Sequence, residues 1–156
     1  MPTPFEKLSA HLNTQDPDSL AWADGLGHEV ASELLSQFSE DDWGELSVSW
    51  KLQSKSWRAC LAVTLYPKNE TASRILLDMT ADPDTEVAFD ALRVVSFYCG
   101  VNANADGPFL DECICSPDFL SLAEVHPSLL SQLKRVSARC TESYRRQFEL
   151  LASRIT

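Results

Sequence analysis

Three histidines are the first candidates for general acid–base chemistry in this sequence. His11, His28 and His126 are scattered along the chain, and no serine stands in the Gly-x-Ser-x-Gly context of a nucleophile elbow. This spacing gives little support to a catalytic triad. We therefore expect no catalytic residues and no enzyme.

Five cysteines could act as nucleophiles or metal ligands. They are Cys60, Cys99, Cys113, Cys115 and Cys140. Their number is odd, they lie in apolar segments, and their spacing matches neither a paired zinc site nor a secreted disulfide scaffold. The strongest thiol candidate is Cys113-Ile114-Cys115, where nearby acids disfavour the thiolate by charge repulsion. We expect reduced cysteines that pack as small apolar side chains.

A third candidate is the acidic run at Asp82, Asp84 and Glu86, which could be read as metal ligands. No glycine and no distal glutamate completes a calcium-binding loop. A turn at Asp82-Pro83-Asp84 followed by a helix N-cap explains these acids instead. We expect no metal site and no cofactor.

The acidic residues are concentrated in the first fifty positions, where ten acids accompany a single lysine, Lys7. The whole chain carries 13 basic and 23 acidic residues, a net charge of -10. Helix starts favour acids, but this surplus exceeds what capping needs. We predict a partner-binding surface formed by Glu29, Glu33, Glu40, Asp41, Asp42 and Glu45. Its partner should be an electropositive protein, since nucleic-acid phosphates and anionic lipid would be repelled.

The element that should position most of these acids is a helix from Ser39, its candidate N-cap, to about Leu52. Trp43, Leu46 and Trp50 follow one another at i, i+3 and i+7, so they line one face. Asp41, Asp42 and Glu45 are expected on the other, solvated face.

The tryptophans allow two interpretations. Trp43, Trp50 and Trp57 repeat every seven residues, and aromatic side chains anchor both cores and interfaces. Core packing is the favoured interpretation.

Apolar residues return at intervals of three and four along most of the chain, which predicts an all-α fold with more than half of the residues helical. The expected helices cover residues 16–23, 28–38, 39–52, 54–66, 70–80 and 84–99, two short segments after residues 107 and 116, and a final helix from Pro127 of up to about 40 Å. The helix expected over residues 28–38 should carry an apolar stripe of Val30, Leu34, Leu35 and Phe38. With 156 residues, 44% of them hydrophobic, we expect a single domain over residues 1–156.

Targeting signals are not evident in this sequence. The first thirty residues lack a basic region followed by an apolar run, and no stretch of about 18 apolar residues occurs. We expect a soluble, cytoplasmic protein without membrane contact.

Residues 75–95 resemble the helix-turn-helix unit of HEAT-like repeats. Ile75-Leu76-Leu77 is followed by the acidic turn at residues 82–84 and then by Val87 and Ala91-Leu92. Trp57 stands thirty residues before Val87, which indicates the second helix of an earlier unit. The resemblance implies a small HEAT-like helical bundle or short solenoid, closed by the long C-terminal helix.

Size, acidity and helical architecture together are similar to those of immunity proteins of bacterial polymorphic toxin systems. This resemblance implies a non-enzymatic inhibitor that occludes the active site of a basic toxin domain. The alternative is a structural or adaptor module in a larger assembly. An immunity gene should lie beside its toxin gene, which would discriminate between the two.

Overall fold

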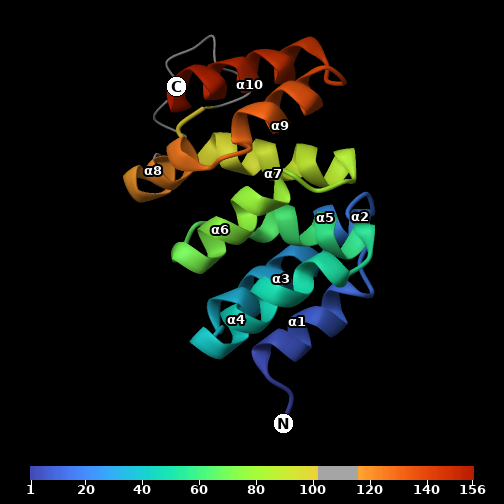
Figure 1. Cartoon of the computed structure of the whole chain (residues 1–156). Coiled ribbons are helices and arrows are strands. Elements are labelled where there is room, and N and C mark those ends of the chain that lie inside the picture. The colour runs from blue at the N-terminus through green and yellow to red at the C-terminus, as the bar shows by residue number, and fades with distance from the viewer. Residues whose placement is uncertain (102–115) are drawn as a thin grey trace. The chain divides into compact units, whose positions relative to one another are not determined.

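The computed structural model describes residues 1–101 and 116–156 (Figure 1). Within these stretches 72% of the residues are helical and no β-strand is present. The all-α prediction and the expected helical majority are therefore confirmed. The predicted loop from Asn102, the short helix with Phe109, and the Cys113–Cys115 pair lie outside the described residues.

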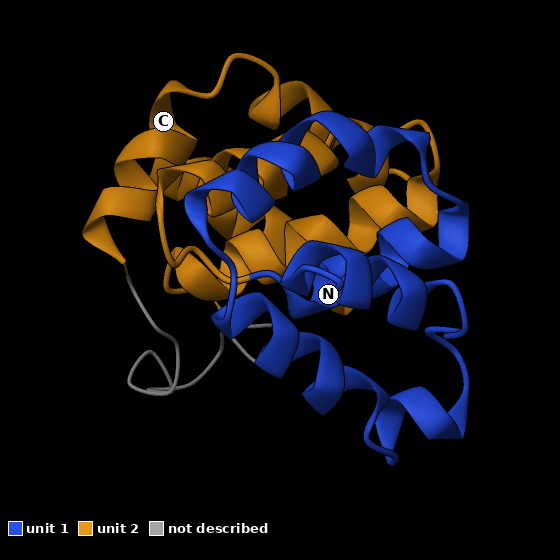
Figure 2. Cartoon of the chain, turned by 90° about the horizontal axis from the view of Figure 1, so that it is seen from below, with its two compact units in different colours: residues 1–65 blue, residues 66–156 orange. Residues whose placement is uncertain are grey.

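The chain divides into two compact units, residues 1–65 and residues 66–156 (Figure 2). That the whole chain forms one domain stays a prediction. The N-terminal unit contains α1 (Pro4–Leu12), α2 (Leu20–Ala23), α3 (Gly27–Ser36), α4 (Glu40–Ser49), the 3-10 helix η1 (Trp50–Leu52) and α5 (Lys55–Thr64).

Helix α1 organises the N-terminal unit, because it packs against α3, α4 and α5. Its Phe5, Leu8 and Leu12 are buried and follow the i, i+3, i+7 spacing of one helix face. A capping box starts the helix: the Thr3 hydroxyl accepts from Glu6 N, while the Glu6 carboxylate accepts from Thr3 N. Sequence reasoning missed this helix, although Thr3 and Glu6 have the capping-box spacing.

Two local expectations in this unit need correction, the second only in part. The helix predicted to open at Asp16 begins instead at Leu20, because Asp16 accepts from Asp18 N in a turn and Ser19 caps the helix. Of the stripe predicted on α3, Leu35 and Phe38 are buried, but Leu34 is half-buried and Val30 is exposed. Gly27 and Ala31 complete the buried face with Leu35.

The C-terminal unit contains α6 (Glu70–Met79), α7 (Thr85–Tyr98), α8 (Pro117–Val125), α9 (Leu129–Ser137) and α10 (Glu142–Ile155). Helix α7 contacts α6, α9 and α10. The predicted core residues of α7 are all fully buried: Val87, Ala91, Leu92 and Val95. Gly100 ends this segment with φ 78°, a left-handed conformation that glycine adopts without steric cost.

The turn between α6 and α7 has the predicted turn-and-cap structure. Asp82 Oδ1 accepts from Asp84 N at 2.9 Å. Asp84 Oδ1 in turn accepts from Glu86 N at 2.9 Å and from Val87 N at 3.3 Å. These carboxylates therefore serve the backbone of the turn.

The single long helix expected from Pro127 is wrong, because α9 and α10 are separate helices. The N–H groups of Arg139 and Cys140 donate to carbonyls three residues back, which tightens and ends α9. Thr141 is extended, with ψ 162°, and the next helix starts after it. The Arg145 side chain donates to the free carbonyl of Cys140 at 3.3 Å.

Among the described residues, every helix is too short or too polar to cross a lipid bilayer.

Candidate functional site

The predicted acids of α4 lie in two different environments. Glu40, Asp41 and Glu45 are exposed, as predicted. Asp42 is only 4% exposed, so the expectation that this carboxylate faces solvent is wrong. At about 100° per residue, Asp42 lies about 40° from the buried Leu46 around the helix axis. A closer reading of the helix wheel would have placed it at the edge of the core.

Hydrogen bonds account for the burial of Asp42. Its Oδ2 accepts from the Ser39 N–H and from the Ser39 hydroxyl, each at 2.9 Å. Its Oδ1 accepts from Phe5 N in α1 at 3.3 Å. Burial by itself raises the pKa of Asp42, but the hydrogen bonds from Ser39 and Phe5 favour the charged form, and the pKa is lowered overall. Asp42 therefore fastens α1 to the start of α4.

The outward side of α4 combines acids with exposed apolar side chains. Val48 is 75% exposed, and Leu52, just beyond the helix, is 84% exposed. On a helix wheel Asp41, Glu45 and Val48 fall within about 60° of one another, opposite the tryptophans. We call Glu40, Asp41, Glu45, Val48 and Leu52 the α4 outer face. Sequence reasoning missed its two apolar members, whose signal was their position off the tryptophan stripe.

Helix α3 carries the remaining predicted acids. Glu29 and Glu33 are both exposed. Leu26, next to the start of the helix, is 69% exposed, and Val30 is also exposed. Within the described residues, none of the acids from positions 1–50 forms an ion pair with a basic side chain. These acids of the N-terminal unit therefore carry negative charge without a direct ion-pair partner among the described residues.

The tryptophans belong to the core, as the favoured interpretation held. Trp43, Trp50 and Trp57 are all buried. Trp57 also donates from Nε1 to the Ser9 carbonyl of α1 at 3.2 Å. They stabilise the scaffold beneath the α4 outer face and do not form part of a surface.

The basic residues near the C-terminus serve largely as backbone caps. Arg135 donates to Asp82 O at 2.9 Å, and Arg154 donates to Cys99 O at 2.8 Å. Their guanidinium groups satisfy carbonyls at the ends of helical segments.

In the part of the chain that the structure describes, the histidine and cysteine side chains are held by structural contacts. His11 Nε2 lies 2.8 Å from Gly27 O, and His126 Nε2 lies 3.1 Å from Asp78 Oδ1. Cys60 and Cys99 are fully buried. Burial raises the pKa of the Cys140 thiol, although the nearby Arg145 acts in the opposite direction. The raised pKa disfavours the thiolate. Across residues 1–101 and 116–156, no group of three metal-ligating side chains comes together.

No protein-family model, no curated protein and no solved structure matches this chain.

Proposed function

We propose that the protein is a non-enzymatic, cytoplasmic inhibitor that binds and occludes an electropositive protein, as an immunity protein does with its toxin. The observation that supports this proposal is that the N-terminal unit carries exposed acidic side chains that form no ion pair with the described residues. Together with Val48 and Leu52, the acids of the α4 outer face combine long-range attraction with apolar surface that can be buried.

The physical basis of inhibition is complementarity of charge. Enzymes that cleave or transfer phosphate-containing substrates present cationic clefts, and an acidic helix face competes for them. The exposed acids speed encounter, while Val48 and Leu52 exclude water once the complex has formed. A HEAT-like arrangement of the helices is part of this proposal and would supply the rigid scaffold.

The first testable prediction concerns charge reversal on the α4 outer face. The double variant Asp41→Lys/Glu45→Lys should slow association with the product of the neighbouring gene at least tenfold at low salt, because steering by these acids is lost. Both side chains are exposed, so folding should be preserved. Biolayer interferometry across a salt series measures the association rate, and an activity assay of the partner measures inhibition.

The matched control is Asp118→Lys/Glu124→Lys, which changes the net charge equally at exposed positions of the C-terminal unit. It should leave association largely unchanged. Equal slowing by both double variants would indicate a general charge effect and would contradict a specific role of α4. A partner that binds through α4 but keeps its activity would favour the adaptor function instead.

A further inference from the structure

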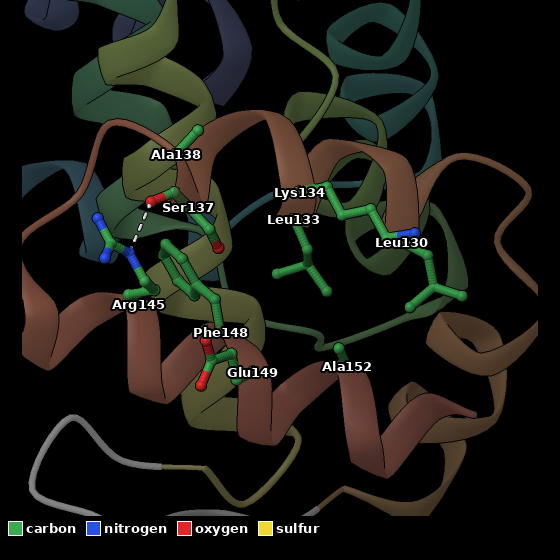
Figure 3. A pocket seen from close by; sticks show the side chains of 9 residues that line it. All are labelled: Leu130, Leu133, Lys134, Ser137, Ala138, Arg145, Phe148, Glu149 and Ala152. Atoms are coloured by element: carbon green, nitrogen blue, oxygen red, sulfur yellow. Dashed lines mark hydrogen bonds between the residues drawn. The ribbon is translucent and has the colours of Figure 1, made fainter.

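A second surface, in the C-terminal unit, differs from the α4 outer face in shape and in charge. Helices α9 and α10 enclose a groove of about 440 Å³ (Figure 3). Leu133 and Phe148 line it and are themselves buried, whereas Leu130 is 39% exposed. Ala138 and Ala152 add small side chains to the lining. The groove is thus mainly apolar.

The charged groups around the groove are predominantly positive. Lys134 and Arg145 line it together with a single acid, Glu149. Lys134 is exposed and its ammonium group has no polar partner among the described residues, whereas Arg145 donates to Ser137 O at 3.4 Å. Residues 127–156 contain six basic and two acidic side chains, in a chain whose net charge is -10. This groove therefore lies in the most basic part of an acidic protein.

The dimensions of the groove suit a helix. Its lining spans Leu130 to Ala138, the C-cap of α9, and Arg145 to Ala152 on α10, which is about 11 to 12 Å along each helix at 1.5 Å per residue. Two helical turns of a bound helix cover this length and present apolar side chains at i, i+3 or i+4, and i+7.

We propose that the α9–α10 groove binds an amphipathic helix of a partner protein whose apolar stripe is flanked by acidic residues. The apolar stripe covers the accessible apolar lining, Leu130, Ala138 and Ala152, above the buried floor of the groove, and the flanking acids pair with Lys134 and Arg145. A helix flanked by lysines meets like charge at both positions and is disfavoured. This inference is independent of the proposed function, because it concerns other helices and a partner of opposite charge.

The test uses two fluorescein-labelled synthetic helices with the same leucine stripe, one flanked by glutamates and one by lysines. Fluorescence anisotropy with the full-length protein is measured at 0.15 M salt, where the Debye length of about 8 Å screens the distant acids of the chain. The glutamate peptide should bind. Its affinity should fall about tenfold with Lys134→Glu and about tenfold with Leu130→Ser.

Two matched controls locate the binding. Lys7→Glu makes the same charge change on exposed α1, and Val125→Ser removes an exposed apolar side chain outside the groove lining. Neither should alter the affinity of the glutamate peptide. The lysine peptide should bind more weakly than the glutamate peptide, because Lys134 and Arg145 repel its flanking charges.

Three outcomes would overturn the proposal. The first is a glutamate peptide that does not bind, and the second is a glutamate peptide whose affinity is the same for the wild type and both groove variants. The third is a dimer, detected by light scattering and dissociated by Leu130→Ser, which would show that a second copy of this chain occupies the groove.

Discussion

Asp42 shows how one side chain can connect two helices that are far apart in the sequence. Its carboxylate accepts from Ser39 at the start of α4 and from Phe5 N in α1. Both contacts favour the charged form, and together they lower the pKa of Asp42 below 3.8. The stability of the N-terminal unit should therefore depend on this charge.

The sign of the pH dependence follows from the lowered pKa. A carboxyl group whose pKa is lower in the folded state stabilises the protein at pH values above its pKa in the unfolded chain, here 3.8. This stabilisation is lost as the pH falls through the pKa of the folded state. Asp42→Asn should cost about 1 to 3 kcal/mol at pH 7, because buried N–H donors lose a charged acceptor. The difference in free energy of unfolding between wild type and variant should narrow below about pH 4.

Urea unfolding followed by circular dichroism at pH 7, 5, 4 and 3.5 measures this difference. The exposed neighbour provides the control, since Asp41→Asn should change stability little at any of these pH values. A difference for Asp42→Asn that stays constant down to pH 3.5 would mean that the charge of Asp42 does not contribute to its hydrogen bonds.

At the residue scale, the sequence predicted cores and caps better than it predicted which acids are solvated. Ser39 was recognisable as an N-cap because it precedes three acids, and the spacing of Trp43, Leu46 and Trp50 identified the buried face. Asp42 was misplaced although the helix wheel puts it beside Leu46; what the sequence did not reveal is its partner, the Phe5 N–H, which a helix missing from the prediction supplies. Long-range polar contacts of this kind leave no periodic signal.

At the scale of elements, Gly44 stands out as a glycine in the middle of an exposed helix surface. A Cβ added there meets no atom within 4 Å. Gly44→Ala should therefore stabilise the protein by about 0.5 to 1 kcal/mol, since alanine favours helix and restricts the unfolded chain. Thermal unfolding measured by circular dichroism gives the change.

Gly25→Ala is the contrasting variant. Its added Cβ would lie 2.3 Å from the Ala21 carbonyl oxygen, so the backbone must shift and stability should fall. If Gly44→Ala were destabilising, α4 would not be helical around this position. Because Gly44→Ala adds no charge, this substitution should leave the electrostatics of the α4 outer face unchanged.

Helix boundaries were predictable where a cap residue interrupts the apolar pattern, and less so elsewhere. Ser116 and Asp84 both cap helices at the expected places. The break before α10 was missed because the apolar spacing continues across it through Cys140 and Tyr144, while Thr141 is the one local signal of a new start. Periodicity alone cannot separate one long helix from two that share a buried side.

At the scale of the whole molecule, the aromatic residues provide separate probes of the two units. All four tryptophans lie in residues 1–65, and all three tyrosines lie in residues 66–156. Tryptophan fluorescence therefore reports on the N-terminal unit, whereas the circular dichroism signal at 222 nm reports on the helices of both.

A core substitution in α7 uses this distribution to test the single-domain prediction. Leu92 is fully buried, so Leu92→Ala should cost about 2 to 5 kcal/mol. If the chain unfolds as one cooperative domain, urea transitions from fluorescence and from circular dichroism coincide, and Leu92→Ala shifts both equally.

The control for this experiment lies in the N-terminal unit. Leu46 is also fully buried, and Leu46→Ala should shift the fluorescence transition whether or not the units are coupled. A fluorescence midpoint that responds to Leu46→Ala and ignores Leu92→Ala would contradict the single domain and show two units that unfold independently.

The packing of α1 also has a consequence for biosynthesis. This helix is translated before its partners: Phe5 N bonds to Asp42, 37 residues later, and Ser9 O accepts from Trp57, 48 residues later. At about 5 to 20 residues per second, the ribosome needs roughly 2 to 10 s to make the chain between Ser9 and Trp57. During that interval the apolar side chains of α1 lack their native partners, so this segment of the nascent chain is a ready target for chaperones.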